Sequence, residues 1–302
     1  MWDSWLISPL KIILDSFKIL ITNKLLFTSI LIFTTLPLST LLISLSFSLH
    51  SRATQIYHLE MLARYSSTRF EARHVWQESR HDALSLLRIK ALFSLPSFLL
   101  SLSAAISSVH SSLSPSPSLR SAFHSISLSF KRPFLTSFFV YAILFVFSPL
   151  RIAFSARFLL NAIYSSLEVY LMAVLSLGIV VSIAEDRFGW DAIRVGSGLM
   201  EGRRFCGWVL SGMLVVASRV IGWKVEELLS GEVEPPEFLG LTELKGKGIR
   251  NEEKAVLIGW YGMVMLLSYV VMSVYYSECR RRHPIKEAVE SDDHHQMHPL
   301  SL

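Results

Sequence analysis

The chain has 302 residues, of which 51% are hydrophobic and only 18% are charged, whereas charged residues make up about 25% of an ordinary soluble domain. Its apolar residues gather in runs of about 20, the length that crosses a bilayer as a helix, and the bases behind its net charge of +5 flank these runs. This distribution excludes an ordinary soluble domain and a nucleic-acid-binding patch, and it predicts an all-α integral membrane protein with about six transmembrane helices and interfacial amphipathic helices.

The N-terminal segment, residues 1–24, is predicted to be an interfacial amphipathic helix. Apolar residues recur in it at helical spacing, while charged residues such as Asp15 and Lys18 take other positions. The long apolar run that follows begins only after Lys24, unlike the short apolar region of a signal peptide, which lies close to the start. We therefore expect an uncleaved anchor.

Residues 25–276 are predicted to form a six-span transmembrane bundle. The six runs of spanning length lie at about residues 25–49, 91–113, 134–150, 162–184, 206–221 and 255–276.

The segments between these spans are polar and differ in character. Residues 51–82 form a charged arm that we expect to be exposed and partly helical, and Pro115 and Pro117 reverse the chain before the third span. An acidic loop, residues 226–253, precedes the last span. Residues 277–302, rich in His and acids, are predicted to be a disordered cytosolic tail.

A similar unit recurs before the first, third and fifth spans, namely a serine, a short half-apolar stretch and a basic pair or near-pair. Its copies are residues 16–24, 125–132 and 197–204. If the similarity is not chance, it implies three helical hairpins that are each entered from the same side, with both termini on that side. The positive-inside rule then places both termini in the cytosol. With no retention or lipidation signal, we expect the endoplasmic reticulum or a later secretory membrane.

One segment carries a resemblance to a known family. Residues 180–204 read VVSIAEDRFGWDAIRVGSGLMEGRR, a span end, an acidic pair, a glycine and a helix that ends in Gly-Arg-Arg. With Asn23-Lys24 and Lys131-Arg132-Pro133, this segment resembles the signature of a family of uncharacterised plant multi-pass transmembrane proteins. More distantly, it is similar to the membrane domain beside some bacterial glycerophosphodiester phosphodiesterases. The resemblance implies a multi-pass membrane protein without the hydrolase domain, and it carries over no catalytic residue.

Glu168, with Asn161 one or two turns away, is the candidate intramembrane polar site. An ionisable group inside a span is costly and often marks an ion or proton path. The alternative is that the fourth span begins a turn later, so that Glu168 lies among the headgroups. Arg219, beside Trp223 and Lys224, is interpreted as a snorkelling anchor.

The remaining candidate residues are expected to have structural rather than chemical roles. Three histidines of the tail, His294, His295 and His298, lack the fixed geometry of a metal site. Gly196, Gly198 and Gly202 form no phosphate loop, and we expect them to serve close helix packing. Five tryptophans near span ends are read as an interfacial belt: Trp2, Trp5, Trp208, Trp223 and Trp260. Cys206 and Cys279 are too few for a disulfide framework, so unpaired thiols are expected. The sequence thus predicts no catalytic, cofactor-binding or metal-binding residue and no enzyme activity.

The sequence is compatible with three functions. The first is a non-enzymatic membrane protein that organises lipids or protein partners through its interfacial helices and C-terminal tail, with the bilayer and no nucleic acid as partners. The second is a transporter or channel for a small solute or ion. The third, a lipid-modifying membrane enzyme, has no supporting set of residues.

Overall fold

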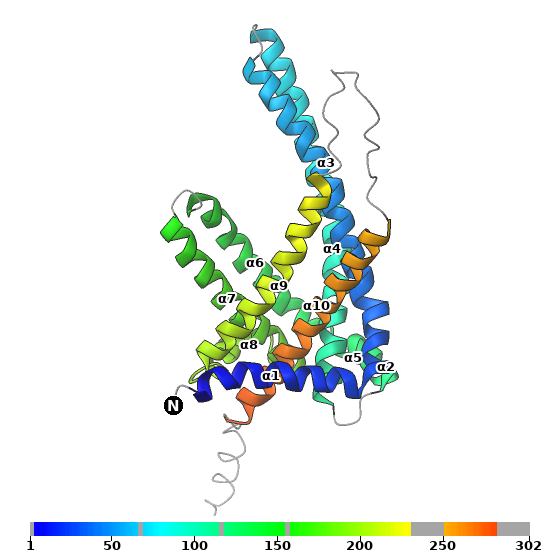
Figure 1. The fold of residues 1–302 in the computed structure, drawn as a ribbon, viewed down its shortest axis with the longest axis vertical. Coiled ribbons are helices and arrows are strands. Elements are labelled where there is room, and N and C mark those ends of the chain that lie inside the picture. Colours follow the sequence, from blue (N-terminus) through cyan, green and yellow to red (C-terminus); the bar gives the residue numbers. More distant parts are fainter. Residues whose placement is uncertain (1–2, 66–68, 115–117, 155–157, 231–250, 283–302) are drawn as a thin grey trace, which may run out of the picture.

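The structure is a computed structural model that describes residues 3–65, 69–114, 118–154, 158–230 and 251–282 (Figure 1). Every regular element in these ranges is a helix, which confirms the all-α membrane class. The helices are α1 (Asp3–Thr22), α2 (Lys24–Ile30), α3 (Leu36–Tyr65), α4 (Arg69–Leu113), α5 (Leu119–Ser129), α6 (Lys131–Phe154), α7 (Phe158–Ala184), α8 (Gly189–Leu199), α9 (Arg204–Ser230) and α10 (Asn251–Arg280).

The helices form three hairpins, and each hairpin follows a helix that lies at the same end of the bundle. In Figure 1, α1, α5 and α8 lie at the lower end, with α1 running across the long helices. The chain passes from α1 into α2–α3 and α4, from α5 into α6 and α7, and from α8 into α9 and α10. The three copies of the recurring serine-to-basic unit all end at these junctions. We call this end, with α1, α5 and α8, the lower end.

Five helical stretches are long and apolar enough to cross a membrane. They are Lys24–His50, Arg80–Leu113, Leu159–Ala184, Arg204–Leu229 and Glu252–Arg282. A sixth candidate combines α5 with α6, which are bent by 67° against each other, and the predicted third span lies within α6. A count of five to six agrees with the prediction of about six.

Three helices are longer than the apolar runs suggest. Helix α9 continues to Ser230, nine residues beyond the predicted end of its span, because Ile221, Val225 and Leu229 keep a buried face at helical spacing. In the predicted arm, α3 continues to Tyr65 and α4 begins at Arg69, so helix extends well beyond the apolar stretch of each.

A π-helical turn, η1 (Leu31–Thr35), joins α2 to α3 inside the first span. Pro37 lies just after it and lacks the N–H that would bond the carbonyl of Phe33 in an α-helix, so the backbone widens by one residue before the proline. The hydroxyl of Thr34 donates to the carbonyl of Ile30 at 2.6 Å. This bond satisfies a carbonyl at the start of the irregular turn.

The main hydrophobic core fills the lower half of the bundle and draws on all three hairpins. Its fully buried members come chiefly from α7, α8, α9 and α10, including Leu177, Met200, Leu210 and Tyr275. A smaller core joins α2, α5 and α10 through Phe27, Ala122 and Val270. Both of these cores therefore lie toward the lower end, and α10 belongs to both.

Candidate functional site

The segment between α7 and α9 carries the densest polar network that the structure describes, at the lower end. Glu185 follows the last residue of α7, and its side chain is 15% exposed. Its Oε1 accepts a hydrogen bond from the Tyr276 hydroxyl at 2.7 Å and lies 3.4 Å from Nε of Arg280. Both partners belong to α10, so one carboxylate joins the end of the second hairpin to the end of the third.

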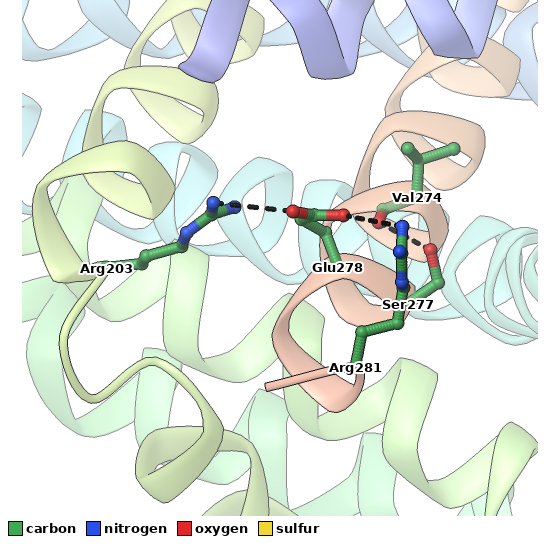
Figure 2. Close-up of polar contacts among 5 residues, drawn as sticks. All are labelled: Arg203, Val274, Ser277, Glu278 and Arg281. Carbon is green, nitrogen blue, oxygen red and sulfur yellow. Dashed lines mark hydrogen bonds and ion pairs between the residues drawn. The ribbon is translucent and has the colours of Figure 1, made fainter. Parts of the chain in front are cut away.

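A second ion-pair chain lies beside the first and is drawn in Figure 2. The carboxylate of Glu278 lies between two guanidinium groups, with Oε1 3.3 Å from Nη2 of Arg203 and Oε2 3.6 Å from Nη1 of Arg281. The backbone of Arg203 is also held, because its carbonyl accepts a hydrogen bond from the Tyr275 hydroxyl at 3.1 Å. The turn between α8 and α9 is thereby fixed to α10 through both its side chain and its main chain.

The same segment is also tied to α6. Arg132, in the first turn of α6, pairs with Asp186. The N–H of Gly189 donates to Oγ1 of Thr136 at 2.9 Å. Gly189 has a φ of +62°, a conformation that residues with a Cβ adopt at a cost, and a Cβ there would lie 3.3 Å from the ring of Phe139.

Helices α7 and α8 meet backbone to backbone at a pair of glycines. A Cβ on Gly196 would lie 3.0 Å from the backbone nitrogen of Gly178, and one on Gly178 would lie 3.1 Å from Cα of Ile193. Small residues let two helices approach this closely. The prediction of close packing is confirmed for Gly196, whereas a Cβ on Gly198 meets nothing within 4 Å, and Gly202 has a positive φ of 81°.

We call the network of Glu185 and Glu278 with their partners the clasp, because it holds the ends of helices together. Its two carboxylates, Glu185 and Glu278, each face arginine side chains, and the cysteines beside it, Cys206 and Cys279, are buried and not joined by a disulfide. Within the ranges described, no three His, Cys, Asp or Glu side chains gather in a way that could hold a metal ion. Buried ion pairs often add little net stability, but removing one partner is costly because it leaves a buried charge uncompensated.

The outer surface of the lower end is amphipathic. On α1, four apolar side chains one turn apart point away from the protein, with exposed fractions of 44–71% (Leu10, Leu14, Phe17 and Ile21), while Ile12 and Ser16 are buried. Exposed apolar side chains continue on α5 with Leu128 and beside and on α8 with Phe188 and Trp190. We call the exposed faces of α1, α5 and α8 the platform.

Glu168, which is partly buried, and Arg219, which is exposed, line one open cavity in the membrane-spanning part. The cavity has a volume of about 420 Å³ and lies among α4, α7, α9 and α10. Hydroxyl groups of Tyr261 and Ser268 lie along the wall that α10 forms, and the rest of the lining is mostly apolar, with methionines such as Met172. Glu168 lies ten residues into α7, and two helices that are distant in sequence bring the two opposite charges to one space.

The other predicted residues have different surroundings. Asn161 lies on an exposed position of α7 and does not line this cavity. Trp208, Trp223 and Trp260 have exposed fractions of 36%, 63% and 60%, and Trp208 donates its Nε1–H to the carbonyl of Ser166 at 3.1 Å. The three histidines of the tail and Trp2 lie outside the described residues, and so does the side chain of Trp5.

Sequence reasoning missed the partners of the network and the cavity. The acidic pair Glu185-Asp186 and the pair Arg203-Arg204 were visible in the sequence, but Glu278 and Tyr276 looked like ordinary residues at the end of the last span. One signal in the sequence could have revealed these partners. Acids and bases lie at span ends that the hairpin topology brings to the same end of the bundle.

The comparisons with known proteins give one match. A family model described as a domain of unknown function, DUF8558, matches residues 6–295. No curated protein and no solved structure matches the chain.

Proposed function

We propose that this chain, which belongs to the DUF8558 family over nearly its whole length, is a non-enzymatic membrane organiser. That family has no described activity, so the proposal is argued from the geometry of the structure. In this proposal the platform binds anionic lipid headgroups of one leaflet and presents them, or protein partners, at that membrane face. The observation that carries the proposal is the placement of all three amphipathic helices, α1, α5 and α8, at one end of the bundle.

The charge of the lower end supports this role. Among the residues described there, eleven bases are exposed against three acids, Asp186, Asp191 and Glu201. The exposed bases are Lys11, Lys18, Lys24, Arg120, Lys131, Arg132, Arg187, Arg194, Arg204, Arg281 and Arg282. Each base close to an anionic surface contributes about 1 kcal/mol of attraction, so a platform that also inserts apolar side chains fits a negatively charged leaflet.

The orientation and compartment are part of the same proposal. The eleven exposed bases of the lower end support a cytosolic position for that end by the positive-inside rule, and in this proposal both ends of the described chain lie in the cytosol. A membrane of the endoplasmic reticulum or a later secretory compartment has such a leaflet. The likeness to plant multi-pass proteins and to the membrane domain beside bacterial phosphodiesterases is consistent with this layout and stays a prediction.

Lipid enrichment around the full-length protein tests the proposal. The protein is reconstituted in vesicles of phosphatidylcholine with a minor fraction of labelled phosphatidylserine, and energy transfer from a dye on the protein reports local enrichment. We expect enrichment that falls severalfold in the double variant Lys11→Gln/Lys18→Gln. The matched control is Lys224→Gln/Lys254→Gln, at the other end of the bundle. Equal enrichment in all three proteins would refute lipid organisation by the platform.

Protein partners require a separate experiment. Cross-linking in native membranes is expected to recover a stable partner through residues of the platform. Recovery of no stable partner would leave lipid organisation as the whole of the proposed role.

A transporter is the second candidate, because the cavity with Glu168 and Arg219 lies inside the spanning region. Solute flux in reconstituted vesicles tests it with Glu168→Gln. Flux equal to that of protein-free vesicles, or flux unchanged by the substitution, would refute transport through this cavity. No grouping of side chains that we describe favours the third candidate, a lipid-modifying enzyme.

A further inference from the structure

A second open cavity, of about 490 Å³, lies among α3, α4, α6 and α10, and we call it the groove. Aromatic rings form much of its wall, because the ring centroid of Phe98 lies 5.4 Å from that of Phe134 and 5.5 Å from that of Tyr141. Leu95, Phe138 and Tyr141 are each more than half exposed. In a bilayer, the groove is therefore open to hydrocarbon chains.

A row of polar side chains on α4 runs along this apolar groove. The row consists of Lys90, Ser94, Ser97 and Ser101, which are spaced by four, three and four residues and all line the groove. This spacing places them one above the other on a single face of the helix. Two of the hydroxyls are bonded within the protein, since Ser94 donates to the carbonyl of Ala91 at 2.8 Å and Ser101 lies 3.0 Å from the hydroxyl of Tyr269.

Ser97, between these two serines, differs from both. Its side chain is buried, with the residue only 9% exposed, and its Oγ has no hydrogen-bond partner in the part of the chain that the structure describes. A buried hydroxyl without a partner costs free energy, and in a bilayer no bulk water replaces the missing partner. A ligand in the groove with a carbonyl oxygen at this depth would accept the hydrogen bond.

The only charge among the described residues that line the groove is Lys90 at its upper end. Lys90 precedes Leu113, the last residue of α4 at the lower end, by 23 residues, or about 34 Å at 1.5 Å per residue. The hydrocarbon layer is about 30 Å thick, so Lys90 lies at the headgroup level of the leaflet opposite the platform. No acid lines the groove that would repel an anion there.

We propose that the groove binds one anionic glycerophospholipid from the leaflet opposite the platform. The order along α4 is a cation, then hydroxyls, with aromatic rings of α6 further toward the lower end, and it matches the order of phosphate, ester and acyl chain in such a lipid. The phosphate contacts the ammonium of Lys90, which acts as a point charge for phosphate. An ester carbonyl accepts a hydrogen bond from Ser97, and one acyl chain lies against Phe98, Phe134 and Phe138. This site goes beyond the platform, and either proposal can fail while the other stands.

Photo-crosslinking of the full-length protein in phosphatidylcholine vesicles tests the site. Two trace probes carry the same diazirine-bearing acyl chain, one on phosphatidic acid and the other on phosphatidylcholine, and peptide sequencing locates the adducts. Leu159 and Ile163, which are exposed on α7 outside the groove, serve as the internal control. Relative to these positions, groove residues should be labelled about fivefold more by phosphatidic acid than by phosphatidylcholine, because Lys90 favours the anionic headgroup.

Paired variants of α4 assign this preference to the groove. Lys90→Gln should abolish the preference for phosphatidic acid, whereas Arg88→Gln, at the same level but outside the groove, should keep it. Ser97→Ala should lower groove labelling by both probes about fivefold, because both carry the ester. Ser103→Ala, whose hydroxyl bonds the carbonyl of Leu99, should leave the labelling unchanged.

Three results would overturn the proposal. The first is an equal ratio of the two probes at the groove and at the α7 control positions in the unaltered protein, a measurement that needs no variant to fold. The second is a preference for phosphatidic acid that survives Lys90→Gln, or labelling unchanged by Ser97→Ala. The third is loss of groove labelling in the platform variant Lys11→Gln/Lys18→Gln, which should keep it if the two sites are separate.

Discussion

Replacement of Gly196 by alanine tests the backbone contact between α7 and α8. The new Cβ would lie 3.0 Å from N and 3.2 Å from Cα of Gly178, and 3.3 Å from the carbonyl carbon of Leu177. All three are backbone atoms, which cannot rotate away as a side chain does. Helix α8 would have to move outward by a few tenths of an ångström, which would loosen its contact with α7.

The expected loss of stability follows from a comparison of two variants, Gly196→Ala and Gly198→Ala. Alanine is a better helix former than glycine by about 1 kcal/mol, and this gain applies to Gly196→Ala and to Gly198→Ala alike. Overpacking costs about 1–3 kcal/mol and applies only to Gly196, because a Cβ on Gly198 meets nothing within 4 Å. Gly196→Ala is therefore expected to be less stable than Gly198→Ala by about 1–3 kcal/mol.

Reversible unfolding of the full-length protein in mixed micelles, with increasing mole fraction of dodecyl sulfate, measures both variants. The Gly198 variant is expected to be as stable as the parent or slightly more stable. Equal stability of the two variants would show that α7 and α8 are not in backbone contact. Greater loss in the Gly198 variant would contradict the placement of α8 altogether.

Three further predictions concern the lower end and the topology. A double-mutant cycle on Arg203 and Glu278 should give a coupling free energy of about 1–2 kcal/mol. The exposed pair Lys224–Glu227 is the control and should give less than about 0.5 kcal/mol. Equal couplings for the two pairs would argue against the clasp. The two buried cysteines should react with a maleimide only after unfolding, and fast labelling of the native protein would contradict their burial. Engineered glycosylation sites should be modified in residues 51–82 and 226–253 but not near Pro115 or in the tail; a modified tail would exclude the proposed orientation.

The layout of the hairpins could be predicted because its signals are local. Bases must stay near water, so the unit that ends at Lys24, Arg132 and Arg204 marks the point where each long helix leaves the lower end. Apolar runs of spanning length fix where the long helices lie. The same reasoning placed the helix before the first span, since its apolar residues recur at helical spacing.

The site could not be predicted because it depends on contacts between distant segments. Tyr276 donates a hydrogen bond to Glu185, which lies 91 positions earlier in the chain. Nothing in the local sequence of either segment indicates that the two residues meet. Arg219 was interpreted as an anchor because its own neighbours, Trp223 and Lys224, suit a membrane surface. Only the packing of α7 against α9 shows that it shares a cavity with Glu168. The length of α9 was underestimated because charged residues interrupt its apolar run while its buried face continues.

Helix α1 packs against α9 and α10, and its Ile12 belongs to the main core. Helix α1 therefore leaves the ribosome before its permanent neighbours in the third hairpin, α9 and α10, have been made. Until then the buried face of α1 has no protein to cover it, and the membrane surface must accommodate that face during translation. Completion of the bundle is thus coupled to synthesis of α10, and a chain truncated before α10 would leave the buried face of α1 without its neighbour on that helix.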